Sequence, residues 1–139
     1  MKRKKNRKWY AEITMENDII RSDTMSYDVD LVDNEGNIVE VVPHQEGGIV
    51  CLGGSDKAAL SVTYNYTKFY YENLDEKDGL RWLDGKLAKD TLVRLEQTIE
   101  KLVGDKSDYY EATAGNAKHA LKILLAWAKQ YPYAKFKVV

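Results

Sequence analysis

The chain has 139 residues, enough for one domain, and carries 21 Lys and Arg against 22 Asp and Glu. Its 44% hydrophobic content can build a packed core, which excludes a collagen-like or intrinsically disordered chain. One Cys excludes an intrachain disulfide scaffold, and no apolar run approaches the roughly 18 residues of a membrane span. These values predict a soluble protein of mixed α and β structure.

The basic charge is concentrated at the N-terminus, while the rest of the chain is acidic. Without the basic residues of segment 1–8, the chain holds 15 basic and 22 acidic residues. Three interpretations remain open for an extension over residues 1–24: electrostatic docking on nucleic acid or an anionic membrane, a solvated end, or a stretch outside the native domain, with Met25 as the true start. The basic residues are Lys2, Arg3, Lys4, Lys5, Arg7 and Lys8.

The first regular element is expected to be a β-hairpin. In residues 26–32, Tyr27, Val29 and Leu31 alternate with polar residues, which predicts a half-buried strand. Turn-forming residues occupy 33–37, and an apolar run at 38–42 predicts the second strand. A short buried strand is a further possibility at 49–52, and the clearest alternating pattern in the chain predicts a strand over 58–66.

Helical spacing replaces alternation after residue 66. The pattern predicts a short helix over 67–74, a helix from Asp90 as N-cap to Gly104 at the C-terminal end, and a helix over 116–131 stopped by Pro132. Residues 134–139 alternate again and predict an edge strand. The expected fold is therefore α+β in a single domain over 25–139: an antiparallel sheet covered by two or three C-terminal helices.

A loop histidine is the candidate for acid–base chemistry. His44 and Glu46 lie beside the glycine pair at 47–48, so that Glu46 could orient His44 as a general base, although the spacing matches no phosphate-binding loop. The alternative is a hairpin connection whose glycines adopt positive φ. The acids of 28–35 do not match the calcium-loop spacing, and Cys51 has no zinc-like partners, so no metal and no cofactor are expected.

An aromatic cluster over residues 64–71 is the candidate for binding. Such a cluster packs a core or forms an interface or base-stacking surface. Alternation assigns Tyr64 and Tyr66 to the core. Because neighbouring residues of a helix cannot both face inward, at least one of Tyr70 and Tyr71 must be exposed. The candidate binding residues are Lys68, Tyr70, Tyr71, Tyr109 and Tyr110.

Several segments together resemble a family of small proteins of bacterial phages and integrative elements. They are the Met-Ser-Tyr-Asp motif at 25–28, which continues as Val-Asp-Leu-Val-Asp, the glycine pairs at 47–48 and 53–54, the stretch 62–66, and Gly-Asn-Ala at 115–117 with the apolar helix that follows. The resemblance spans about residues 25–132. It implies an accessory protein of a mobile element inside a bacterial cell and brings no catalytic residues with it.

The sequence thus favours a non-enzymatic protein-binding module, with a host or defence protein as partner and a cytoplasmic location. One alternative is a small-ligand-binding protein or small enzyme that uses His44 and Glu46. A second alternative is nucleic-acid binding through the basic N-terminal residues, with an affinity that falls steeply with salt. No membrane partner is expected, and the oligomeric state stays open.

Overall fold

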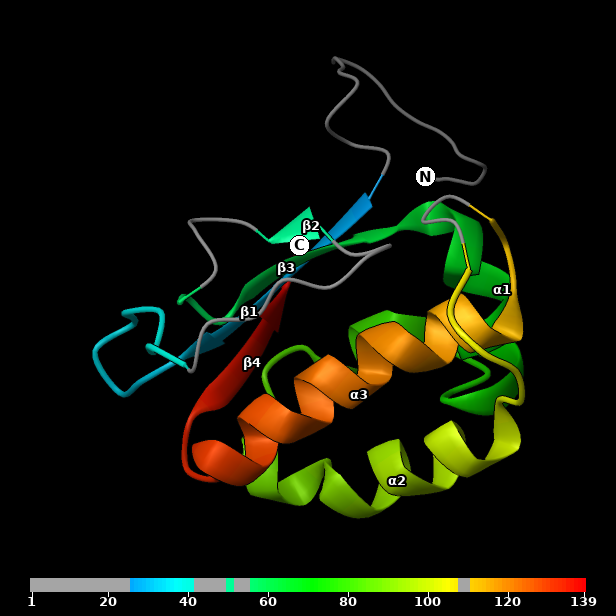
Figure 1. Cartoon of the computed structure of the whole chain (residues 1–139). Coiled ribbons are helices and arrows are strands. Elements are labelled where there is room, and N and C mark those ends of the chain that lie inside the picture. The colour runs from blue at the N-terminus through cyan, green and yellow to red at the C-terminus, as the bar shows by residue number, and fades with distance from the viewer. Residues whose placement is uncertain (1–25, 42–49, 52–55, 108–110) are drawn as a thin grey trace, which may run out of the picture.

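The structure, a computed structural model, describes residues 26–41, 50–51, 56–107 and 111–139 (Figure 1). The predicted α+β class is confirmed. The regular elements are the strands β1 (Ser26–Val32), β2 (Val50–Cys51), β3 (Ala59–Thr63) and β4 (Lys135–Val138), the α-helices α1 (Thr67–Asn73), α2 (Leu92–Lys101) and α3 (Ala114–Gln130), and the 3₁₀ turns η2 (Tyr64–Tyr66), η3 (Gly79–Leu83) and η4 (Ala88–Asp90).

The described strands form one antiparallel sheet in the order β2-β3-β1-β4. β1 lies inside the sheet: Val29 pairs with Leu60 of β3 on one side and with Val138 of β4 on the other. The alternation in β1 is confirmed, because Tyr27, Val29 and Leu31 are buried while the residues between them are partly exposed. This face of the sheet therefore forms one wall of the hydrophobic core.

The predicted hairpin is only partly correct. Its turn forms as expected, since the Asp33 carboxylate accepts hydrogen bonds from the backbone N–H groups of Glu35 and Asn37. The second half, residues 38–41 as far as the structure describes it, makes isolated bridges instead of a regular strand, from Ile38 to Val32 and from Glu40 to Lys57. It follows β1 for one residue and then turns to the start of β3, so that its backbone hydrogen bonds are divided between the two strands.

The strand predicted over 58–66 ends earlier, at Thr63. The Thr63 side chain accepts a hydrogen bond from the backbone N–H of Asn65, which caps the 3₁₀ turn η2 that leads directly into α1. Alternation continues in the sequence, but this cap bends the backbone away from the sheet. The β3–α1 junction therefore places Tyr64 and Tyr66 in a turn and not on a strand face.

β4 confirms the predicted edge strand, and its outer edge is hydrogen-bonded by the segment before α2. Gly85 donates to the Phe136 carbonyl, and Phe136 donates to the Lys86 carbonyl, at 2.8 and 2.9 Å. The Asp84 carboxylate accepts from the Val138 N–H at 2.9 Å. This cover satisfies edge groups that would otherwise be open to another strand.

The helices cover one face of the sheet, with α3 directly below it and α2 below α3 (Figure 1). The wide apolar stripe of α3 is confirmed by its buried residues, which include Leu121, Leu124 and Trp127. The predicted start of α2 at Asp90 is wrong: residues 88–90 form η4, and Thr91 is the residue before the helix. In the described part of the chain, no helix combines the length and the apolar character needed to cross a membrane.

Candidate functional site

Most of the candidate residues from the sequence lie outside the described residues. These are His44 and Glu46, the tyrosines Tyr109 and Tyr110, and the basic residues of segment 1–8. The structure therefore does not test the acid–base and nucleic-acid hypotheses. The other three candidates lie within the described residues, and all of them are on α1: Lys68, Tyr70 and Tyr71.

Tyr70 is not available for binding, which corrects its assignment as a candidate binding residue. Its side chain is buried, and its hydroxyl donates a 3.0 Å hydrogen bond to the backbone carbonyl of Ala117 in α3. Its ring meets the ring of Tyr66 edge to face, with 6.5 Å between centroids. Tyr70 therefore fastens α1 to α3 and belongs to the core.

Tyr71, in contrast, lies at the surface, with 37% of its area exposed. Its ring lies against Gly79, where a Cβ atom would come within 2.9 Å of the ring. Gly79 also has φ +59, a conformation that favours glycine. The glycine thus provides both the turn and the close approach that hold the Tyr71 ring in place.

A second tyrosine and an arginine extend this exposed region. The half-buried Tyr64 packs edge to face on the buried Tyr27, with 4.7 Å between ring centroids. The exposed guanidinium of Arg81 lies 4.8 Å from the Tyr27 ring centroid, and its Nη2 atom is 3.5 Å from the Tyr64 hydroxyl. Lys68 lies three residues before Tyr71 and thus on the same side of α1. We call Tyr64, Lys68, Tyr71 and Arg81 the tyrosine–arginine surface.

Tyr27 supports this surface from below. Its hydroxyl is 3.0 Å from the Thr67 hydroxyl, which ties β1 to the first residue of α1. Burial raises the pKa of Tyr27 to about 12, while the Thr67 hydrogen bond and the Arg81 charge act in the opposite direction. The phenol is therefore neutral at physiological pH and presents its ring to the Arg81 cation.

Sequence reasoning missed Arg81 and a neighbouring stack around Trp82. Two cations contact the Trp82 ring: Lys86 Nζ at 4.5 Å and the Arg94 guanidinium at 4.4 Å from its centroid. Arg94 also forms an ion pair with Asp75 at 3.1 Å. The consecutive Arg81 and Trp82 within a polar stretch were the available signal, because these residue types are the ones enriched at binding surfaces.

The start of α3 is fixed by its own cap and by the loop before it. Thr113 accepts a hydrogen bond from the Asn116 N–H and so caps the N-terminus of α3. The buried Asn116 side chain accepts from the Ser107 N–H at 2.8 Å and donates to the Glu111 carbonyl. These bonds hold Ser107 and Glu111 to the first turn of α3.

The described residues supply the chemistry of a binding surface. Among them, no group of three or more His, Cys, Asp and Glu residues is placed to hold a metal ion. The tyrosine–arginine surface instead combines two tyrosines with an arginine, residue types that are enriched in the energetically dominant part of protein interfaces. Comparison with known proteins adds no assignment: the chain matches no family model, no curated protein and no solved structure.

Proposed function

We propose that this protein is a non-enzymatic protein-binding module whose contact surface centres on Tyr71 and Arg81. The observation that supports the proposal most directly is the exposed Tyr71 ring held against Gly79. Burying an aromatic ring that is already fixed costs little conformational entropy on binding. A fixed aromatic residue beside an arginine is therefore well suited to serve as an interface anchor.

The charge of the surface indicates the chemistry of the partner. Lys68 and Arg81 are both exposed, and within the described residues neither takes part in an ion pair. Arg81 has one face on the Tyr27 ring and keeps further N–H groups for an acceptor. The proposed partner is thus a protein with carboxylate side chains next to an apolar patch, and we propose a host or defence protein in this role.

The alternatives make different use of the molecule. A small enzyme or ligand-binding protein would need His44 and Glu46, and nucleic-acid binding would need the basic residues of 1–8, all outside the described residues. Stacking of nucleic-acid bases on Tyr71 would also need a positively charged groove that follows the bound nucleic-acid strand. Within the described residues, the exposed and fixed aromatic ring favours the protein-binding hypothesis.

Affinity capture with matched variants tests the proposal. The full chain, Tyr71→Ala, Arg81→Ala and the control Val103→Ala would be immobilised, and bacterial proteins retained by each would be quantified by mass spectrometry. Val103 is a suitable control because it is 73% exposed and lies beyond the end of α2. The protein retained by the unmodified chain would then be purified for calorimetric titration.

We expect Tyr71→Ala and Arg81→Ala each to weaken that complex by at least about tenfold, which corresponds to about 1.4 kcal/mol. Val103→Ala should leave the dissociation constant unchanged. Thermal unfolding of all variants would establish that each is folded. Retention of full affinity by both variants, or the absence of any specific partner, would contradict the proposal.

A further inference from the structure

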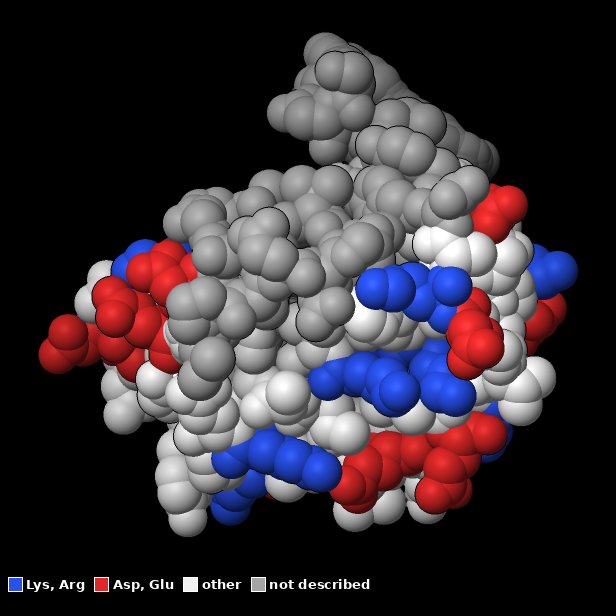
Figure 2. Space-filling view, in the orientation of Figure 1, with Lys and Arg blue, Asp and Glu red and all other residues white. Residues whose placement is uncertain are grey.

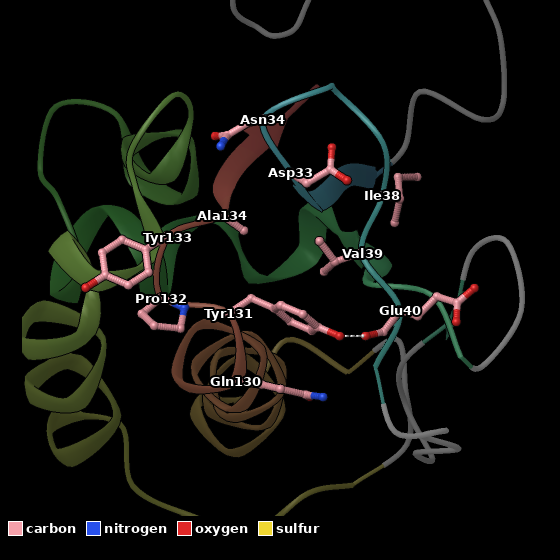
Figure 3. A pocket seen from close by; sticks show the side chains of 10 residues that line it. All are labelled: Asp33, Asn34, Ile38, Val39, Glu40, Gln130, Tyr131, Pro132, Tyr133 and Ala134. Carbon is pink, nitrogen blue, oxygen red and sulfur yellow. Dashed lines mark hydrogen bonds between the residues drawn. The ribbon is translucent and has the colours of Figure 1, made fainter.

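An open groove lies away from the tyrosine–arginine surface, at the end of the sheet where β1 leaves its partners. Its volume is about 620 Å³, and its walls are segment 33–40 on one side and segment 130–134 on the other (Figure 3). Grooves of this size hold small ligands or a few side chains of a peptide. The two walls come from opposite ends of the described chain.

The wall formed by 33–40 is held by its turn. The Asp33 carboxylate accepts from the Glu35 and Asn37 N–H groups, and Gly36 supplies the positive φ of +83. Val39 then donates to the Leu31 carbonyl, which returns the segment to β1. This wall is therefore held by hydrogen bonds within the chain.

The wall formed by 130–134 is equally constrained. Tyr131 ends α3 by donating to the Trp127 carbonyl, and Lys89 donates to the Pro132 carbonyl. The Tyr131 phenol reaches across the groove and donates to the Glu40 carbonyl, as the dashed line in Figure 3 shows. This hydrogen bond joins the two walls directly at this point. The shape of the groove is therefore set by bonds within the chain.

The groove combines apolar contact area with negative charge. Ile38 and Tyr133 are exposed to 38% and 74%, while Asp33 and Glu40 supply carboxylates. Figure 2 shows acidic side chains gathered at this end of the molecule, around the turn at 33–37. Helix α3 also ends here, and the C-terminal end of a helix carries a partial negative charge that favours cations.

We propose that this groove binds a short extended peptide segment of a partner protein, in which a Lys or Arg lies next to an apolar residue. The cation would meet the Asp33 carboxylate, and apolar side chains along the extended peptide would cover Ile38 at one side of the groove and Tyr133 at the other (Figure 3). The chemistry is opposite to that of the tyrosine–arginine surface, which presents cations. The protein would then contact two partners, or two parts of one partner, at separate surfaces.

The cations already present do not block this groove. Lys57 pairs with Glu40 at 3.0 Å, with side chains 36% and 73% exposed, and such exposed pairs contribute little and exchange readily. Lys89 lies 5.7 Å from the Tyr133 ring centroid, again at the surface. None of the groove-lining residues is itself basic. The lining itself carries two carboxylates and no basic residue, while Lys129 and Lys135 flank the 130–134 wall in the sequence.

Selection from a displayed library of short random peptides on the immobilised full chain tests the inference. We expect enrichment of Lys or Arg next to aliphatic or aromatic residues. A dye-labelled peptide with the selected sequence would then be titrated by fluorescence anisotropy against the protein and its variants. Binding should weaken by at least about tenfold for Tyr133→Ala and by several-fold for Asp33→Asn, and it should also weaken with salt.

Two features of the variants keep the test decisive. Asp33→Asn removes the charge and keeps the side-chain oxygen that accepts the turn hydrogen bonds, so the wall stays folded. Tyr71→Ala should leave peptide affinity unchanged, which separates this groove from the proposed protein-binding surface. Enrichment of acidic peptides, no enrichment at all, or affinity that is insensitive to both groove variants would overturn the inference.

Discussion

Gly115→Ala should destabilise the protein, although the same change usually stabilises a helix. Gly115 lies in the first turn of α3, where it touches the backbone of the preceding loop. A Cβ atom there would be 2.1 Å from the Asp105 carbonyl oxygen and 2.6 Å from its carbonyl carbon. Ordinary contact begins at 3.4 Å, so the loop or the helix would have to move by about 1.3 Å.

The cost of this movement follows from what holds the loop. Ser107 donates to the Asn116 side chain at 2.8 Å and accepts from it at 3.2 Å, and a shift of the loop weakens both bonds. Two such bonds are worth about 1 kcal/mol each, and overpacking of a tight contact costs about 1–3 kcal/mol. Higher helix propensity of Ala returns up to about 1 kcal/mol. We expect a net loss of about 2–4 kcal/mol.

Urea unfolding followed by circular dichroism measures this loss, and a thermal scan should show a midpoint lower by about 7–14 °C. Ala126→Gly is the matched control, because Ala126 is exposed in the same helix and reports helix propensity alone. It should cost about 1 kcal/mol. If Gly115→Ala is as stable as the unmodified chain or more stable, the close approach to Asp105 is wrong.

Three further predictions concern single side chains. Tyr70→Phe removes the hydrogen bond to Ala117 and should lower the free energy of unfolding in urea by about 1 kcal/mol, with no loss of partner binding. A variant that is fully stable but binds its partner more weakly would contradict the assignment of Tyr70 to the core. Burial raises the pKa of Tyr27 from 10.0 to about 12, so the neutral Tyr27 phenol contributes its full stabilisation of the folded state below pH 10. This contribution to the free energy of unfolding falls by about 3 kcal/mol as pH rises through 12. The stability difference between the unmodified chain and Tyr27→Phe should show this fall, and a constant difference would contradict it. Asp84→Ala exposes the Val138 N–H and should cost about 1 kcal/mol, with faster amide exchange at Val138; unchanged exchange would refute that cap.

The elements that depend on a periodic pattern could be predicted from sequence. The alternation of Tyr27, Val29 and Leu31 located β1, and the apolar stripe of 117–128 located α3. Both patterns report which side of an element meets the core, and that property is local. The edge position of β4 followed from the alternating lysines of 134–139.

The ends of elements depended on side-chain hydrogen bonds that a pattern does not contain. Alternation in 58–66 continues through Tyr66, but the Thr63 hydroxyl caps a 3₁₀ turn and ends β3. Segment 38–41 is apolar enough for a strand, yet its backbone bonds are shared between β1 and β3. In both cases the tertiary partner decided the conformation, and propensity did not.

The candidate site shows the same limit at the level of single residues. Helical geometry established that Tyr70 and Tyr71 cannot both face the core, but it did not indicate which one does. That choice depends on the Ala117 carbonyl, which receives the Tyr70 hydroxyl, and on Gly79, which leaves room for the Tyr71 ring. Both partners are distant in sequence or separated by a turn, so no local signal could identify them.

The groove at the other end is an extreme case of this dependence. Its walls are about ninety residues apart in sequence, and neither wall has a pattern that predicts binding when taken alone. Asp33 reads as a turn residue, and Tyr131 and Pro132 read as the end of a helix, which are the roles that both segments do perform. The bond from the Tyr131 phenol to the Glu40 carbonyl joins the walls. Because each segment is already held by its own structural bonds, the groove can accept substitutions at Asp33 or Tyr133 without unfolding, and this is the property that makes a binding function at this site testable.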